Sequence, residues 1–190
     1  MSRFCALLDA CVLVPITLAD TLLRLAEADL YRPLWSTKIL EEVRSAIVTV
    51  HPDMADGRAA LRVARMDAAF EDACVTGWEA LVDSIVLPDQ NDRHVVAAAQ
   101  RGRADVIVTQ NLKDFPPDRL ASLEIEVQHP DEFLLNQLDL APDRTMQVLA
   151  EQVADARRPA LTLEALLDRL ARAGARRFAQ EASRQLWRAR

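Results

Sequence analysis

Glycine and aromatic residues are scarce in this chain of 190 residues. There are only 4 glycines and aromatic side chains make up 5% of the sequence, whereas alanine and leucine abound. This composition favours helices packed through small aliphatic contacts over a β-sandwich or a β-barrel. The length suffices for one full hydrophobic core with a small appendage.

Long hydrophobic runs are also missing. The longest apolar stretches fall far short of the roughly 20 residues that a membrane-spanning helix needs. The N-terminus runs directly into a short apolar segment without a small-residue cleavage site. We therefore expect a cytoplasmic protein with no membrane partner.

Cysteine is limited to three residues, Cys5, Cys11 and Cys74. The number is odd and no C-x-x-C spacing occurs, so neither a disulfide framework nor a zinc site is indicated. We expect reduced thiols in the core.

The net charge of −6 argues against a simple basic nucleic-acid binder. The charge is unevenly distributed, however, because residues 1–140 hold 13 Lys and Arg against 23 acids, whereas residues 141–190 hold 10 Arg against 6 acids. The C-terminal part is therefore electrostatically different from the rest.

Strand-like and helix-like segments alternate in the first 140 residues. Residues 4–8 and 105–109 are short apolar runs typical of strands buried in a parallel sheet. The pattern predicts a doubly wound α/β sheet flanked by helices. Further extended segments are expected at 85–87 and 125–128, and helices at 16–28, from Ser36 onward, from Pro52 to about Phe70, up to about Gly102, and around Phe133.

Only helices are predicted after Leu140, at about 143–156, 161–172 with Thr162 as its cap, and 175–188. We therefore divide the chain into a domain of residues 1–140 and an all-helical, Arg-rich extension of residues 141–190. The extension carries too much apolar surface for a freely solvated arm. We expect it to pack on the body, on a second subunit or on a protein partner, although its arginines could also grip RNA phosphates.

Four carboxylates occupy positions that favour a shared site. Asp9 directly follows the first strand and Asp114 lies just beyond the strand at 105–109. Active sites of open α/β sheets lie outside the carboxyl ends of the strands, so both should reach the same edge. Glu42 on the second helix and Asp92 in the first turn of a later helix could point at them.

Carboxylates this close raise one another's pKa, and a divalent cation is their natural counter-charge. An all-oxygen site selects Mg²⁺ or Mn²⁺ over zinc. Asp9 is the hardest of the four to explain structurally, because an acid among Leu7, Leu8 and Val12 is buried at a cost unless it binds a cation or forms hydrogen bonds.

Ordinary structural roles remain open for the other residues. Asp89 could cap the helix that follows it, Asp114 could stabilise a turn, and either Glu41 or Glu42 could be a solvated surface charge. Thr109 could be a strand-end hydroxyl, and Arg93 and Lys113 solvated charges. The histidines, which have no ligand spacing, are expected at the surface or in loops: His51, His94 and His129.

Four segments together resemble the PIN domain, and within it the toxins of VapC type: LLDACVLV, STKILEEV, LPDQNDRHVVAAA and DVIVTQNLKDFP. The resemblance covers roughly residues 4–135. It implies a PIN-like fold whose metal-binding and catalytic acids fall on four positions of this chain. These are Asp9, Glu42, Asp92 and Asp114, with Glu41 as the alternative to Glu42.

The resemblance also implies how these residues act. One Mg²⁺ held by Asp9 and Asp92 would activate a water, and a second held by Glu42 and Asp114 could neutralise the leaving oxygen. The residues expected to bind substrate are Thr109, Asn111, Arg93 and Lys113. Many PIN domains carry an acid where this chain has Asn111. The resemblance therefore leaves open whether a second metal ion binds.

The implied function is a Mg²⁺- or Mn²⁺-dependent endoribonuclease that hydrolyses phosphodiester bonds in RNA, the toxin of a type II toxin–antitoxin system. Its implied partners are RNA, a cognate protein antitoxin and a second copy in a homodimer. Two alternatives stay open, namely a structure-specific DNA nuclease and a catalytically silent PIN-like binding module. Cleavage of RNA against flapped DNA, and metal binding, would separate them.

Overall fold

The chain forms two compact units, and each combines segments that are distant in sequence. The computed structural model describes residues 4–54, 57–156 and 160–189. The first unit holds the residues up to Val14 together with Arg32–Gln128, and the second holds Pro15–Tyr31 together with the residues from His129 onward. The predicted division at residue 140 stays a prediction about domains.

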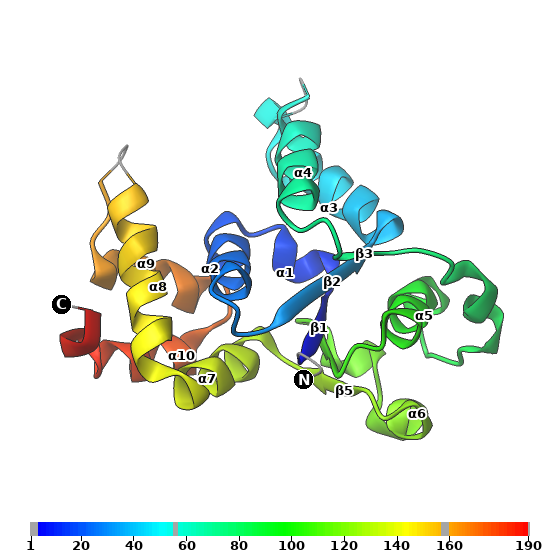
Figure 1. Cartoon of the computed structure of the whole chain (residues 1–190). Coiled ribbons are helices and arrows are strands. Elements are labelled where there is room, and N and C mark those ends of the chain that lie inside the picture. The colour runs from blue at the N-terminus through cyan, green and yellow to red at the C-terminus, as the bar shows by residue number, and fades with distance from the viewer. Residues whose placement is uncertain (1–3, 55–56, 157–159, 190) are drawn as a thin grey trace. The chain divides into compact units, whose positions relative to one another are not determined.

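A five-stranded parallel sheet is the centre of the first unit (Figure 1). The strand order is β3-β2-β1-β4-β5. The chain moves from β1 outward to one edge and then returns to β4 on the other side of β1, so the switch point lies between β1 and β4. The strands are β1 (Cys5–Leu8), β2 (Arg32–Ser36), β3 (Cys74–Val75), β4 (Val106–Val108) and β5 (Glu126–Gln128).

The predicted fold class, a parallel sheet flanked by helices, is confirmed. Both apolar runs form the central strands β1 and β4, whose residues are fully or almost fully buried. The segment at 85–87, predicted as a short strand or an extended link, is a link: Ile85 has an extended backbone, and the structure assigns none of the three residues to a strand.

The α-helices that the structure describes in the first unit are α1 (Ala10–Leu13), α3 (Thr37–Val50), α4 (Arg58–Ala69), α5 (Arg93–Gly102) and α6 (Pro117–Leu120). Helix α5 packs against β1, β2, β3 and β4, whereas α3 contacts β2 and α4 lies beside α3 (Figure 1). Ser36 caps α3 as predicted, with its hydroxyl accepting a hydrogen bond from the Ile39 amide. Helix α4 begins later than predicted, at Arg58, and the predicted positions 55–56 lie outside the described residues.

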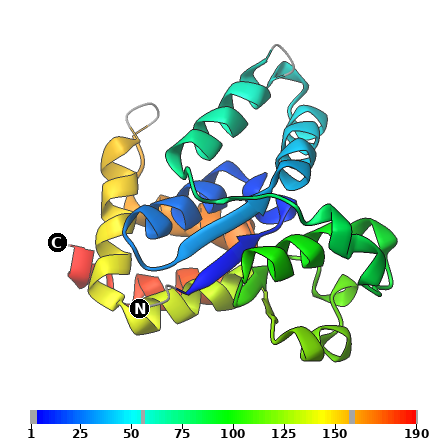
Figure 2. The same cartoon turned by 45° about the vertical axis from the view of Figure 1, so that its right-hand side comes forward.

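The second unit consists of helices (Figure 2). Helix α2 contacts α8 and α9, although more than 100 residues separate them in sequence. A buried hydrogen bond of 2.8 Å from Thr21 Oγ1 to Gln152 Oε1 joins α2 to α8. The helices are α2 (Ile16–Glu27), α7 (Pro130–Leu140), α8 (Pro142–Asp155), α9 (Leu163–Arg172) and α10 (Arg176–Ser183).

The apolar surface of the C-terminal helices is buried within this second unit. Leu166, Leu170 and Phe178 are fully buried. Thr162 caps α9 as predicted, through a hydrogen bond from the Ala165 amide. Within the described ranges, no helix is both long and apolar enough to cross a membrane.

Candidate active site at the carboxyl ends of β1 and β4

Asp9 lies at the switch point of the sheet, directly after β1. Its carboxylate is buried and every oxygen has a donor. Oδ1 accepts a hydrogen bond of 2.7 Å from the Ala10 amide, since Asp9 is also the N-cap of α1. Oδ2 accepts from Thr109 Oγ1 at 2.7 Å and from Cys11 Sγ at 3.1 Å. These bonds compensate for the burial of the charge and fix the orientation of the carboxylate.

Thr109 connects Asp9 to the loop after β4. Its side chain is fully buried, and its Oγ1 accepts a hydrogen bond of 3.1 Å from the Asn111 amide while donating to Asp9. The hydroxyl is therefore already engaged with the carboxylate. The predicted contact of Thr109 with substrate stays a prediction, and its observed contact is with Asp9.

Asp92 stands at the N-cap of α5, where the helix dipole favours an anion. Burial nevertheless raises the pKa of Asp92 to about 6, helped by the charges of Asp9, Asp89 and Asp114. The desolvation and the like charges thus outweigh the dipole. The charges of Asp9 and Asp114 therefore both act on Asp92, and so does that of Asp89.

Asp89 also has the structural role considered for it. It caps the 3-10 turn Gln90–Asp92 by accepting a hydrogen bond of 2.8 Å from the Asn91 amide.

The loop after β4 carries the remaining predicted residues. Asn111 and Lys113 are exposed, and Asp114 is half-buried at the end of the turn Leu112–Asp114. Arg93, the residue after Asp92, is half-buried, and its Nε is a buried atom without a hydrogen-bond partner. Arg93 directly follows Asp92 in the sequence, and Lys113 directly precedes Asp114. Positive charges of this kind can bind the phosphates of a polyanion.

Glu42 is paired with a histidine of α5. Its Oε1 lies 3.0 Å from His94 Nε2 and 3.6 Å from Lys38 Nζ. Glu42 is not among the main charges that raise the pKa of Asp92, whereas His94 lowers that pKa. Glu41 is exposed, so Glu42 is the glutamate of this pair that faces α5.

Two site residues escaped the sequence prediction. His94 was expected at the surface or in a loop, and this is wrong, since it is buried on α5 and paired with Glu42. Cys11 contacts Asp9, and burial together with the charge of Asp9 raises the pKa of the Cys11 thiol to about 12. The thiol therefore stays protonated and acts as a hydrogen-bond donor. Each lies two residues after a predicted acid, which is the signal that could have indicated them.

The donor set fits a hard divalent cation. Asp9, Asp92 and Asp114 offer carboxylate oxygens, and the pKa of Asp92 is raised by burial and by the negative charges of Asp9, Asp89 and Asp114, which a cation would neutralise. In the described part of the chain, no three His, Cys, Asp or Glu side chains are already arranged as a metal site.

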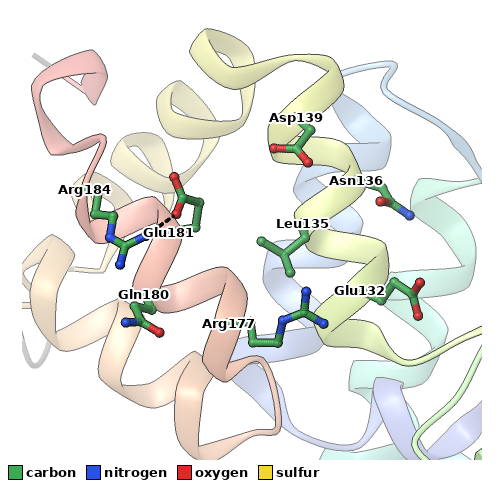
Figure 3. Close-up of a pocket in the computed structure, with 8 residues that line it drawn as sticks. All are labelled: Glu132, Leu135, Asn136, Asp139, Arg177, Gln180, Glu181 and Arg184. Carbon is green, nitrogen blue, oxygen red and sulfur yellow. Dashed lines mark hydrogen bonds and ion pairs between the residues drawn. The ribbon is translucent and has the colours of Figure 1, made fainter.

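A separate hollow of about 450 Å³ lies between α7 and α10 of the helical unit (Figure 3). Two acids of α7, Glu132 and Asp139, line one side, and Arg177 of α10 and Arg184, which directly follows α10, line the other. None of the predicted site residues lines it. This hollow is therefore distinct from the acidic cluster at β1 and β4.

Comparison with known proteins gives the family of the chain. A family model described as the PIN domain matches residues 5–113, which is more than half of the chain. The chain belongs to the PIN domain family. The match contains Asp9, Glu42 and Asp92 and ends one residue before Asp114.

A second family model, described as the VapC50 C-terminal domain, matches residues 130–184 of this PIN protein. The chain is also 52% identical over 79 residues to a protein of Mycobacterium tuberculosis (strain ATCC 25618 / H37Rv) named "Putative ribonuclease VapC50". That alignment covers 42% of this chain and 47% of the relative, so the chain is matched to about half the length of that protein. No solved structure matches the chain.

Proposed function

We propose that this PIN protein is a divalent-metal-dependent endoribonuclease and the toxin of a type II toxin–antitoxin pair. The observation that carries the proposal is the pKa of Asp92, which burial raises to about 6 with help from the charges of Asp9, Asp89 and Asp114. The similarity to a protein named as a ribonuclease of VapC type supports RNA as substrate. A cognate antitoxin, a homodimer and a cytoplasmic location belong to the same proposal.

Different residues of the chain would bind the metal and the phosphate. Asp9, held by Thr109, Cys11 and Ala10, and Asp92 at the start of α5 would hold Mg²⁺ or Mn²⁺, with Asp114 and Glu42 contributing from the loop and from α3. A bound divalent ion supplies a lower pKa for its water and charge neutralisation at the phosphate. Arg93, Lys113 and Asn111 would orient the scissile phosphate.

Cleavage of a defined RNA by the purified chain tests the proposal. We expect cleavage with Mg²⁺ or Mn²⁺, none with EDTA, and a loss of about 100-fold or more in Asp9→Asn, the scale on which removing one charge-stabilising group lowers enzyme rates. Glu41→Gln is the matched control for Glu42→Gln, because Glu41 is exposed. The Glu41→Gln variant should cleave RNA like the wild type. Undiminished cleavage by Asp9→Asn would refute the assignment, and preferential cleavage of flapped DNA would favour the DNA nuclease.

A further inference from the structure

Within the described residues, the ion-pair partner of His94 is Glu42. The imidazole is only 7% exposed, its Nε2 lies 3.0 Å from Glu42 Oε1, and its Nδ1 is buried without a partner. Nε2 is the ring nitrogen nearest to this carboxylate, and it can act as a donor to Oε1 when it carries the proton. The orientation of the ring is therefore tied to Glu42.

Packing holds the ring in this orientation. The ring of Trp78 lies 5.9 Å from the His94 ring at an interplanar angle of 55°. Trp78 precedes the 3-10 segment Glu79–Ser84, which packs against α5. Nε2 is thereby presented to α3 and not to solvent.

The two partners of Glu42 are unequal. Lys38 is on the same helix, about half exposed, and its Nζ lies 3.6 Å from Oε1. Such an exposed pair is screened by water and contributes little. His94 comes from another element and approaches to 3.0 Å in a buried setting. It joins α3, which carries Glu42, to α5, whose N-cap is Asp92.

We propose that His94 is a positioning residue that holds the Glu42 carboxylate at the edge of the acidic cluster and so raises the affinity of the site for a divalent cation. The inference rests on the proposed function, because it assumes that the cluster binds this cation. Hydrogen bonds to metal-binding carboxylates commonly account for 10-fold to 100-fold in metal affinity or activity.

Mn²⁺ binding to the full chain, measured by isothermal titration calorimetry without RNA, tests the role of His94. His94→Phe keeps a ring beside Trp78 and removes the donor, so we expect Mn²⁺ affinity to fall about 10-fold to 100-fold. His94→Gln places an amide donor near the original Nε2 and should restore most of the affinity. Lys38→Met removes the other partner of the same oxygen and should change affinity by less than about 5-fold.

A double-mutant cycle shows whether His94 acts through Glu42. In the Glu42→Gln background, His94→Phe should lower the affinity by no more than about 2-fold further. Circular dichroism checks that each variant is folded. If His94→Phe does not fold, the Mn²⁺ affinities of His94→Asn and His94→Gln are compared instead. Only the longer glutamine side chain reaches Glu42, so His94→Asn should bind Mn²⁺ more weakly than His94→Gln.

The outcomes separate this inference from the proposed function. Wild-type affinity in His94→Phe, or an equal loss in the Glu42→Gln background, overturns the positioning role while metal binding and RNA cleavage by the wild type stand. A wild-type chain that neither binds Mn²⁺ nor cleaves RNA overturns the proposed function, and the positioning role with it.

Discussion

Individual side chains around Asp9 form a connected set of donors. The Asn111 amide donates to Thr109 Oγ1, and Thr109 donates to Asp9 Oδ2, so the loop after β4 is linked to the acid after β1. Such preorganisation fixes a carboxylate before any ligand arrives. We infer that Thr109 acts by orienting Asp9.

Thr109→Val tests this inference. Valine keeps the shape of threonine but leaves the buried Oδ2 of Asp9 with only the weak thiol donor of Cys11. We expect the free energy of unfolding to fall by about 1.5–3 kcal/mol, the range for hydrogen bonds to charged groups. Urea denaturation measures it, and Thr76→Val, at an exposed threonine, is the matched control. Equal effects of the two substitutions would contradict the role of Thr109.

The pH dependence of stability follows from Asp92. The fold raises the pKa of Asp92 to about 6, so the folded chain binds this proton more tightly than the unfolded chain does. The stabilising effect of the proton is complete below about pH 4 and is lost as the pH rises through about 6. Without metal, Asp92→Asn should therefore be more stable than the wild type at pH 7.5.

The gain should be about 1 kcal/mol, because Asp92 is only half-buried and solvent screens its neighbours. It should vanish near pH 4, and Mn²⁺ should stabilise the wild type more than the variant. Thermal unfolding in EDTA and in Mn²⁺ at the two pH values measures both effects. A variant less stable than the metal-free wild type at pH 7.5 would contradict the origin given for the raised pKa.

Among the elements, α10 depends on a cap supplied by another helix. Its own N-cap residue, Ala175, has no side chain that can accept a hydrogen bond. Asp131 of α7 accepts instead, from the Phe178 amide at 2.8 Å and from the Arg177 amide at 3.2 Å. The carboxylate satisfies two free amides and complements the helix dipole.

Removing this cap should destabilise the chain. Asp131→Ala is expected to lower the free energy of unfolding by about 1–2 kcal/mol. Asp139→Ala, at an exposed residue of the same helix, should change it by less than about 0.5 kcal/mol. Chemical denaturation of both variants gives the comparison, and equal stabilities would show that the cap contributes nothing.

Prediction from the sequence worked for elements with a strong local pattern. The apolar runs of β1 and β4 and the periodic helices are recognisable because each carries its own burial signal. β2 lacks such a pattern, since it contains Pro33, and β3 has only two residues. Their strand conformation depends on pairing with distant segments. The run at 85–87 has the composition of a strand but finds no such partner.

The same distinction applies to the site. The rule that sites lie at the carboxyl ends of strands selected Asp9 and Asp114, which follow the adjacent strands β1 and β4 and both act on the pKa of Asp92. The contact of His94 with Glu42 follows from the packing of α5 near α3, which no local pattern encodes. Likewise, Glu41 and Glu42 are equivalent by composition and differ only in which one faces α5.

The whole molecule interleaves its two units along the sequence. Helix α2 belongs with the C-terminal helices, where Leu18, Leu22 and Leu25 are fully buried and Arg24 pairs with Asp155 at 2.8 Å. The predicted domain of residues 1–140 contains α2 but lacks α8 and α9, which contact it.

A chain truncated after residue 140 should therefore fold poorly. Loss of α8 and α9 exposes the apolar face of α2, and each leucine loses about 1.5–3 kcal/mol of burial free energy. We expect a lower melting temperature than that of the full chain and strong binding of the dye ANS. A cooperative transition at the full-chain temperature without dye binding would instead establish residue 140 as a domain boundary.

The position of α2 also constrains how such chains can diverge. A recombination event near residue 129 that brought in a foreign C-terminal segment would leave Thr21 and Arg24 facing helices without Gln152 and Asp155. In such a chimera, the contacts between α2 and the C-terminal helices would no longer be complementary. Residues 16–27 and 142–155 should accordingly covary among relatives, so that this stretch near the N-terminus records the ancestry of the C-terminal segment and not that of the sheet around it.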